Sequence, residues 1–319
     1  MGGCVMDNDK CPLVSICCQT YNHVSYIRDC IEGFLLQKTS FPIEILIHDD
    51  ASVDGTADII REYEIKYPKL IYPIYQTENQ YSKGARVPSI NYRRSKGKYI
   101  AFCEGDDYWT DPLKLQKQIE FLESHSEYGV CSHVYRTLEN GVFTEIDTSK
   151  QRKNKEIKRC IQFNYIEYNR DDNFFAWYTQ PLTLVFRKTL LENLPKTEKN
   201  MHYNDVSLAY DFLTTSKGAF AFIDAGVYRK HGHGIYTSLT TYEYYIKYRS
   251  VYEELYNRNP CDRTLRYMYV KYTMMSFIIN KDFKNAAYYS IKTIALNPKE
   301  SVPFIASIFI RRMKKVIHL

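Results

Sequence analysis

The stretch KGKYIAFCEGDDYWTDPLKLQKQIEFLE, residues 96–123, decides the fold. Its part from 98 to 103 is a short apolar run of the kind that forms a buried strand. Three carboxylates and a glycine follow directly. Asp111-Pro112 then opens a segment with helical spacing of apolar residues, and aspartate and proline are both favoured where a helix starts. The stretch therefore predicts a buried strand, an acidic turn and a helix.

The same succession of strand and helix runs through the preceding residues. Apolar runs predict strands over 13–19, 42–48 and 70–75, and helical spacing predicts helices over 25–37 and 56–67. Such alternation predicts an α/β fold with a Rossmann-like, mostly parallel central sheet and helices on both faces. In sheets of this kind ligands bind outside the carboxyl ends of the strands, which is where this chain carries its acidic clusters.

The remainder of the chain is less regular. A hairpin is predicted over 130–146 around an Asn-Gly turn. Residues 150–178 are charged and aromatic without a clear period, so we expect a mobile excursion there. From about residue 240 onward every segment has helical character. We therefore expect an α/β domain over 11–239 and a C-terminal helical appendage over 240–319.

The composition is that of an ordinary globular protein, with 45% hydrophobic residues and a net charge of +6. Nine cysteines without regular spacing indicate reduced thiols in a cytoplasmic protein. The basic residues are scattered, which argues against a nucleic-acid partner. No apolar run reaches the ~18 residues of a spanning helix. Residues 303–319 join an apolar block to basic side chains, which fits either peripheral contact with the inner face of a membrane or a terminal helix packed on its own domain.

The first acidic cluster, Asp49-Asp50, follows the strand predicted over 42–48. One interpretation is a polar pocket at the carboxyl edge of the sheet. The other is ordinary turn and helix-capping chemistry, because aspartate is common in both roles.

The second cluster is Glu104, Asp106 and Asp107 in the opening stretch. Gly105 permits a bend that brings the three carboxylates around one point. Like charges this close repel each other unless a cation compensates them. Hard divalent cations take one or two carboxylates together with ligand phosphates. The two acidic clusters together favour a nucleotide and metal site over a solvated acidic turn.

Several segments are similar to those of family 2 glycosyltransferases of the GT-A fold, the bacterial type that builds surface polysaccharides. VSICCQTYN (14–22) resembles the family's opening strand and turn, and ILIHDDASVDGT (45–56) resembles its VDDGSTDGT signature. The opening stretch resembles its DxD segment. NDVSLAYDFL (204–213) and VYRKHGHG (227–234) resemble its base-bearing segment and its later histidine turn. The resemblance implies a nucleotide-binding half over 11–125 and an acceptor half over 126–239.

The resemblance also implies roles for residues that bind the nucleotide. Tyr21 would stack on the base and Asp50 would contact its ring edge. Glu104 stands where the family has the first Asp of DxD, and the added methylene leaves its contact with ribose or metal open. Asp106 would reach the ribose or the metal-bound diphosphate, and Lys83 the diphosphate or solvent.

The implied cofactor is Mn²⁺ or Mg²⁺. Asp107 is the first candidate for a direct ligand, with Asp106 beside it. His231 matches a histidine that closes the metal site in many GT-A enzymes, and His233 competes with it for that role. Asp205 falls at the position of the family's catalytic base. Asp211 is the fallback for this role, and a helix cap is the structural alternative for Asp205.

The implied reaction is sugar transfer with inversion from a nucleoside-diphosphate sugar, UDP-linked in particular, to a hydroxyl of a glycan or lipid-linked glycan acceptor. A non-catalytic nucleotide-sugar-binding subunit of the same fold is the alternative, which the Glu104 departure leaves open. A phospho-acceptor receiver domain also pairs acidic strand ends with Mg²⁺. It needs a lone Asp after the third strand, where this chain has Gln76-Thr77.

Overall fold

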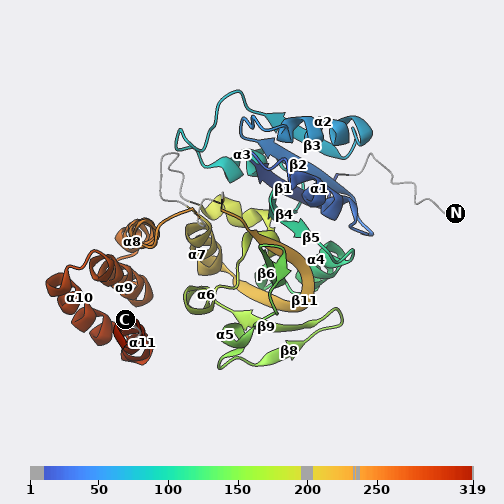
Figure 1. Ribbon diagram of the computed structural model, residues 1–319. Coiled ribbons are helices and arrows are strands. Elements are labelled where there is room, and N and C mark those ends of the chain that lie inside the picture. The colour runs from blue at the N-terminus through green and yellow to red at the C-terminus, as the bar shows by residue number, and fades with distance from the viewer. Residues whose placement is uncertain (1–10, 195–203, 233, 235–237, 318–319) are drawn as a thin grey trace. The chain divides into compact units, whose positions relative to one another are not determined.

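The computed structural model describes residues 11–194, 204–232, 234 and 238–317 (Figure 1). Contacts between Cα atoms divide the chain into two compact units, Met1–His231 and Gly232–Leu319.

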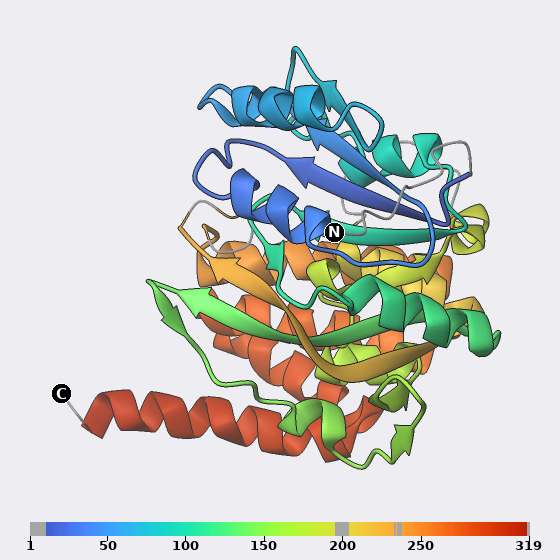
Figure 2. The same ribbon diagram turned by 90° about the vertical axis from the view of Figure 1, so that its right-hand side faces the viewer.

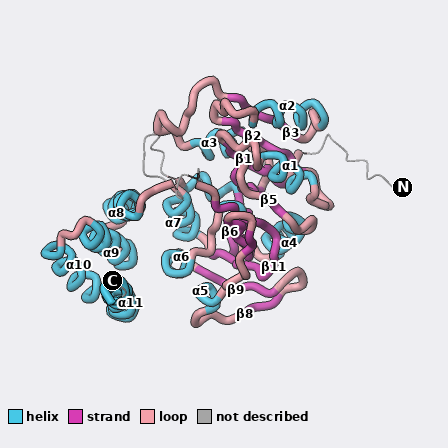
Figure 3. The backbone as a smooth tube through the Cα atoms, viewed as in Figure 1, coloured by secondary structure: helices cyan, strands magenta, loops and turns pink. Residues whose placement is uncertain are grey.

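The first unit is built on an eleven-stranded mixed sheet in which β3-β2-β1-β4-β10-β6-β11-β9-β8 are neighbours in that order. β5 pairs with β11, and β7 pairs with β6. Figure 3 shows the strands in the middle of the unit with helices around them. The strands are β1 (Val14–Thr20), β2 (Ile43–Asp49), β3 (Ile71–Tyr75), β4 (Tyr99–Glu104), β5 (Tyr108–Trp109), β6 (Tyr128–Glu139), β7 (Val142–Phe143), β8 (Ile157–Arg159), β9 (Asn164–Tyr168), β10 (Val185–Arg187) and β11 (Lys217–Lys230).

The first four large strands confirm the predicted α/β fold. β3, β2, β1 and β4 are all parallel, so their carboxyl ends lie at one edge. In the pairing of these strands, Gln19 of β1 lies beside His48 of β2 on one side and beside Glu104 of β4 on the other. Both predicted acidic clusters therefore end up next to the end of β1.

Helices cover both faces of this sheet, as predicted. They are α1 (Ile27–Leu35), α2 (Thr56–Lys66), α3 (Val87–Arg94), α4 (Lys114–Ser124), α5 (Ser149–Arg152), α6 (Arg170–Ala176) and α7 (Asp205–Thr215). Helices α1, α2 and α4 pack with Cys18 in one hydrophobic core, and α3 and α7 pack with Cys17 in the other. Figure 1 shows α1 and α4 on one side and α7 on the opposite side. Cys17 and Cys18, which are neighbours in β1, thus pack into the cores on opposite faces of the sheet, because side chains alternate along a strand.

The second half of the sheet departs from simple βα alternation. β10 runs antiparallel to both β4 and β6, and β11 is parallel to β6 but antiparallel to β9. Strand β11 is long, and its register with β6 shifts after Ala221 and again after Asp224. Such irregularities bend a strand, and Figure 2 shows that β11 is curved. The hairpin of β6 and β7 forms as predicted, with Asn140 and Gly141 at positive φ.

Three expectations from the sequence need correction. Residues 150–178 are not a mobile excursion, since β8 and β9 pair with each other and β9 joins β11. The segment between β3 and β4 contains helix α3, which begins beside Pro88 and was not predicted. Helix α4 begins at Lys114, with Leu113 at the N-cap, and not at Asp111-Pro112 as predicted. The Asp111 side chain instead accepts the Leu113 N–H at 2.8 Å.

The second unit consists of helices α8 (Thr241–Arg258), α9 (Arg263–Ile279), α10 (Phe283–Leu296) and α11 (Pro298–Ile317). Each packs on the next along the chain. Thr240 and Glu243 form a capping box at the start of α8, and aromatic rings of Tyr248, Tyr252 and Tyr272 join α8 to α9. None of the helices in the described ranges is long and apolar enough to cross a membrane.

Candidate functional site

The candidate site lies at the carboxyl ends of β1, β2 and β4. Buried polar atoms without a hydrogen-bond partner among the described residues concentrate here: Gln19 Oε1, Thr20 Oγ1, His23 Nδ1, His48 Nδ1, Asp49 Oδ1, Asp106 Oδ1 and Asp107 Oδ2. Buried polar atoms are normally paired, so such a concentration indicates a position for a polar ligand, an ion or ordered water.

The acidic turn after β4 brings three carboxylates together. One oxygen from each of Glu104, Asp106 and Asp107 lies within 4.8 Å of the others. Gly105 makes this turn possible, because a Cβ there would lie 2.6 Å from Thr20 Oγ1 and 3.1 Å from His23 Nδ1. The glycine thus allows the acidic turn to pack directly on the end of β1.

Asp107 is the most deeply buried member of the cluster, with 1% of its surface exposed. Its Oδ1 accepts the backbone N–H of Arg229 at 2.8 Å, whereas Oδ2 has no partner among the described residues. Burial, followed by the charges of Asp106 and Glu104, raises the pKa of the Asp107 carboxyl well above its usual range. A bound cation would offset this cost of ionisation.

Glu104 lies beside β1, and its carboxylate accepts a hydrogen bond from Gln19 Nε2 at 3.1 Å. Burial raises the pKa of Glu104 to about 8; the charges of Asp106 and Asp205 act in the same direction, and the Gln19 hydrogen bond opposes them. Glu104, at the first DxD position, is therefore part of the cluster: it lies close to the other two carboxylates, and the charge of Asp106 affects its pKa.

Asp106 is held by two histidines. His231 Nε2 lies 2.9 Å from Asp106 Oδ2, and His23 Nε2 lies 3.8 Å from the same oxygen. Burial opposes ionisation of Asp106, but the His231 hydrogen bond and the two histidine charges outweigh it and lower the pKa of the carboxyl. The structure thus brings His231 to the acidic cluster. His233 lies outside the described residues.

The donor set suits a hard divalent cation. It offers carboxylate oxygens from Asp106 and Asp107, including two buried oxygens without partners among the described residues, with an imidazole nitrogen nearby. Residues of the acidic turn therefore fit the metal that the sequence implies.

Asp50, just after the end of β2, holds the loop that carries Lys83. The Asp50 carboxylate is buried and accepts the backbone N–H groups of Gln80 and Tyr81 at 2.8 and 3.0 Å. It thereby anchors the segment that carries Lys83, whose ammonium pairs with Glu78. Tyr21 follows β1 with 44% of its surface exposed, which leaves its ring accessible.

Asp205 begins helix α7. The neighbouring Asn204 provides the N-cap and accepts the N–H groups of Val206 and Ser207 at 3.1 and 3.2 Å. Asp205 also accepts the Val206 N–H at 3.0 Å, but the capping role falls to Asn204. The charge of Asp205 also contributes, as the smallest cause, to the raised pKa of Glu104, after burial and the charge of Asp106.

Two residues of the site were not predicted from the sequence. His23 was missed because nothing in its local pattern marks it, apart from its place just after the strand end. Arg229 donates to the Asp106 carbonyl at 3.0 Å, pairs with Asp29, and lies over the rings of Tyr26 and Tyr108. Only long-range pairing of β11 with β5 brings Arg229 to the acidic turn.

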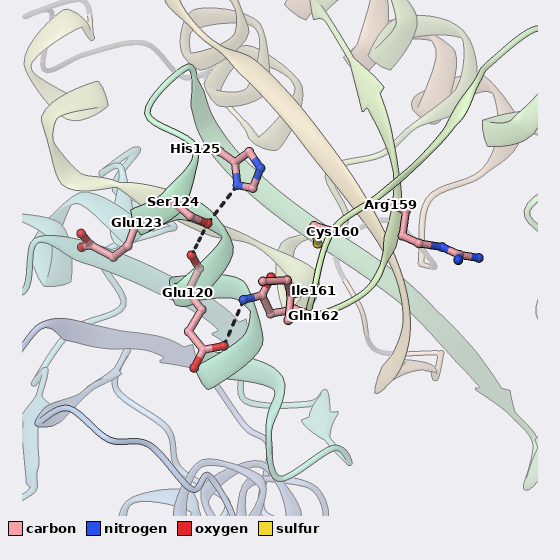
Figure 4. Close-up of a pocket in the computed structure, with 8 residues that line it drawn as sticks. All are labelled: Glu120, Glu123, Ser124, His125, Arg159, Cys160, Ile161 and Gln162. Atoms are coloured by element: carbon pink, nitrogen blue, oxygen red, sulfur yellow. Dashed lines mark hydrogen bonds between the residues drawn. The ribbon is translucent and has the colours of Figure 1, made fainter.

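A separate pocket lies between the end of α4 and the β8–β9 hairpin (Figure 4). Its lining includes Glu120, His125 and Cys160, and Ile161 is almost fully exposed. The end of α4 leads into the start of β6, so this pocket is at the edge of the sheet opposite the acidic cluster. It contains none of the predicted site residues.

The fold and the site together define a GT-A-like class: an α/β protein with a cluster of carboxylates at the carboxyl edge of its parallel strands. The family model described as glycosyl transferase family 2 matches residues 15–192 of the 319. The chain therefore belongs to glycosyl transferase family 2, a family of glycosyltransferases, as its motifs predicted.

Two curated relatives illustrate the range of this similarity. An uncharacterized protein of Mycobacterium tuberculosis is 35% identical over 231 residues, which cover 72% of this chain and 62% of the relative. The Escherichia coli protein WfaP, named UDP-Glc:alpha-D-GlcNAc-diphosphoundecaprenol beta-1,3-glucosyltransferase, is 39% identical over 124 residues, covering 39% of this chain and 46% of WfaP. The matched region thus spans less than two thirds of either relative.

Two solved structures share the fold at low sequence identity. The complex of S. aureus TarS residues 1–349 with UDP-GlcNAc aligns with a TM-score of 0.59 and 17% identity, covering 90% of this chain and 82% of the other. The mannosyltransferase PcManGT of Pyrobaculum calidifontis, in complex with GDP-Man and Mn²⁺, aligns with a TM-score of 0.56 and 16% identity, covering 96% and 82%. Both similarities confirm the predicted GT-A architecture.

Proposed function

We propose that this protein is an inverting glycosyltransferase that moves a sugar from a UDP-linked donor to a hydroxyl of a glycan or lipid-linked glycan during surface-polysaccharide synthesis. Family membership supports the reaction class. The names of the relatives support the substrates: WfaP is named for a UDP-glucose donor and a diphosphoundecaprenol-linked acceptor. The observation that carries the proposal is the buried acidic turn at the end of β4, where Asp106 and Asp107 each have an oxygen with no partner among the described residues.

The nucleotide would lie across the ends of β1 and β2. The exposed ring of Tyr21 suits stacking on the base. Asp50 would define the base pocket through its ring-edge contact and through the 79–81 backbone that it anchors. Lys83 would turn from Glu78 to the diphosphate, because an exposed ion pair of this kind contributes little and is easily exchanged.

Asp107, Asp106 and His231 would hold a divalent cation, Mn²⁺ or Mg²⁺. When bound, the cation supplies stabilisation of the negative charge that develops on the leaving diphosphate. PcManGT, whose structure contains Mn²⁺ with a nucleotide sugar, supports this assignment by its shared fold. Glu104 would face the ribose, where its raised pKa lets the protonated carboxyl donate a hydrogen bond near neutral pH.

Asp205 would accept the proton of the acceptor hydroxyl as the oxygen attacks the anomeric carbon. Asn204 already caps α7, so the Asp205 carboxylate is not needed as the helix cap. A positioned carboxylate is one of the side chains that act as general bases. A single in-line displacement inverts the anomeric configuration. Asp211, on the same helix, is the second candidate.

A non-catalytic, nucleotide-sugar-binding subunit is the alternative function. The observation that favours it is Glu104 at the first DxD position with a pKa near 8, which lowers the negative charge of the site. Such a protein would bind the donor without turning it over.

A donor screen tests the proposal. The full chain is incubated with Mn²⁺ and each of UDP-Glc, UDP-Gal, UDP-GlcNAc, UDP-GalNAc and GDP-Man, and both binding and release of the nucleotide are measured. Hydrolysis of a UDP-sugar supports the enzyme. Binding without hydrolysis supports the non-catalytic alternative, and neither binding nor hydrolysis of any donor contradicts both.

We further propose that the protein works in the cytoplasm, in peripheral contact with the inner face of the membrane, where lipid-linked acceptors are found. Helix α11 supports this by its exposed Val302 and Ile310 and by the basic run that follows in sequence. In the adjoining α10, Phe283 and Ile291 are also exposed, at 59% and 70%. Apolar side chains beside basic ones suit an anionic membrane surface.

A further inference from the structure

We propose that His23 is an additional ligand of the divalent cation, beside Asp106 and His231. The inference rests on the proposed function, because it concerns the cation of that same site. It assigns a metal-binding role to a residue of the β1–α1 turn, a segment otherwise expected only to contact the nucleotide.

The backbone places His23 rigidly. Its N–H donates to Thr56 Oγ1 at 2.8 Å, and its carbonyl accepts the N–H groups of Tyr26 and Ile27 at 2.9 and 2.8 Å. On either side, Asn22 N–H donates to Ser52 Oγ and Val24 N–H to Asp54 Oδ2. The turn is therefore tied to the start of α2, and the imidazole is presented from a fixed backbone.

The ring lies against the acidic turn. Nε2 is 3.8 Å from Asp106 Oδ2, and Nδ1 faces Gly105, where a Cβ would come within 3.1 Å of it. The His23 and His231 rings are 6.2 Å apart, centroid to centroid, and nearly perpendicular. Two imidazoles, arranged edge to face, therefore approach the same carboxylate oxygen.

The side chain is mostly buried beside the acidic turn, with its Nε2 facing Asp106 and its ring in edge contact with the rings of Tyr26 and His231. Its exposed fraction is 17%, and Nδ1 is buried without a partner among the described residues. The 3.8 Å between Nε2 and Asp106 exceeds a hydrogen bond. Asp107, 1% exposed, independently aims an unpartnered oxygen into the same cluster. A cation bound by His23 Nε2 within this group would give the unpartnered oxygens of Asp106 and Asp107 a partner.

The ligand chemistry makes the inference specific. Mn²⁺ also prefers oxygen ligands, but as a transition metal it accepts imidazole nitrogen more readily than Mg²⁺, which keeps oxygen ligands and water. A second imidazole should therefore raise affinity for Mn²⁺ more than for Mg²⁺. A histidine that only packs against the turn would affect both ions alike.

The test compares wild type with His23→Ala and His23→Asn, each with UDP present. Mn²⁺ binding is followed by the electron paramagnetic resonance signal of free Mn²⁺, and Mg²⁺ binding by competition. We expect the Kd for Mn²⁺ to rise at least about tenfold and the Kd for Mg²⁺ to change less. An unchanged Kd for Mn²⁺, or an equal loss for both ions, overturns the inference. His125→Ala, at the opposite edge of the sheet, is the matched control.

A measurement on the wild type does not depend on how the variants fold. With ¹⁴N- and ¹⁵N-histidine protein, electron spin-echo modulation of bound Mn²⁺ counts the coordinating imidazoles. Two coordinating nitrogens in wild type and one in His231→Ala support the inference, and one in wild type overturns it. If wild type binds no Mn²⁺ with or without UDP, the proposed cation site itself fails. Normal Mn²⁺ binding with a single nitrogen refutes only the role of His23.

Discussion

The three acids after β4 have different surroundings, and each is expected to do a different job. Asp107 is buried among like charges, Asp106 is paired with His231, and Glu104 is hydrogen-bonded to Gln19. Burial and repulsion raise the pKa of Asp107 and Glu104, while the histidines lower that of Asp106. The proposed cation would offset the repulsion between these carboxylates.

Asp107→Asn should separate folding from cation binding. The amide oxygen can still accept the Arg229 N–H, and one buried negative charge is removed. We expect the free energy of unfolding in EDTA to be unchanged or about 1 kcal/mol higher. The rise in melting temperature that Mn²⁺ and UDP give the wild type should disappear. Thermal melts in EDTA and in Mn²⁺ with UDP check this; an equal Mn²⁺ response in both proteins would remove Asp107 as a ligand.

Asp205→Asn should affect the chemical step alone. Loss of a general base costs about 10²–10⁴-fold in rate, so we expect kcat to fall by that range while the Kd for UDP with Mn²⁺ stays the same. Steady-state transfer assays and titration calorimetry measure the two quantities. The matched control is Asp211→Asn. If transfer survives in Asp205→Asn and is lost in Asp211→Asn, the base has been misassigned.

Lys114 gives a pH-dependent prediction away from the site. It is fully buried, with Nζ 3.9 Å from the centre of the Trp109 ring and no hydrogen-bond partner among the described residues. Burial lowers the pKa of Lys114 to about 7. Since the unfolded chain keeps its proton up to a pKa of about 10.4, the free energy of unfolding should rise with pH from about 7 to about 10.

Lys114→Met should remove that part of the pH dependence. We expect the variant to be about 1–3 kcal/mol more stable at pH 7, because an unpaired buried polar group is replaced by an apolar one of similar length. The gain should shrink at pH 9. Urea denaturation at both pH values checks this, and an identical pH slope in the two proteins would show that Lys114 is hydrated or paired.

At the scale of elements, the turn between β4 and β5 determines the site. Its sequence signal was strong, since a buried strand followed by Glu-Gly-Asp-Asp predicted both the turn and its acidity. The closure of the turn by Arg229 could not be predicted, because it depends on β11 pairing with β5 across more than a hundred residues. Helix α3 was missed for a different reason: its stretch VPSINYRR is short and has little apolar periodicity.

Gly105→Ala tests the close packing of this turn on β1. The added methyl would come within 2.7 Å of Thr20 Cβ, so either the turn or the strand end must move. We expect a loss of about 1–3 kcal/mol in the free energy of unfolding, together with weaker Mn²⁺ binding. Gly232→Ala is the control, since a Cβ there has no described atom within 4 Å. A Gly105→Ala protein with full stability and full Mn²⁺ affinity would contradict the proposed packing.

At the scale of the whole molecule, the sequence predicted the parallel half of the sheet better than the rest. In residues 13–103 each buried strand is a separate apolar run, and helical segments lie between these runs, so the local pattern alone indicates the alternation of strands and helices. The antiparallel insertion of β10 between β4 and β6, and the joining of 164–168 to β11, are long-range pairings that no local pattern specifies. The four C-terminal helices were predicted as helices, but their sequence carries no motif for a partner.

The proposed membrane contact belongs to this scale. Full-length protein should float with vesicles that contain anionic lipid and remain behind with neutral vesicles, and added salt should weaken the association. Ile291→Asp on α10 and Ile310→Asp on α11 should each reduce flotation at unchanged melting temperature. Equal recovery with neutral and anionic vesicles, or none with either, would contradict an anionic membrane partner.

UDP binding, measured by calorimetry in wild type and Asp107→Asn with Mn²⁺ and with EDTA, tests most directly whether the site at the end of β4 is cation-dependent. We expect wild type to bind UDP tightly with Mn²⁺ and much more weakly with EDTA, whereas Asp107→Asn should bind weakly in both. UDP binding that is independent of Mn²⁺ in wild type, or that is unaffected by Asp107→Asn, would contradict a cation-dependent nucleotide-sugar site at the end of β4.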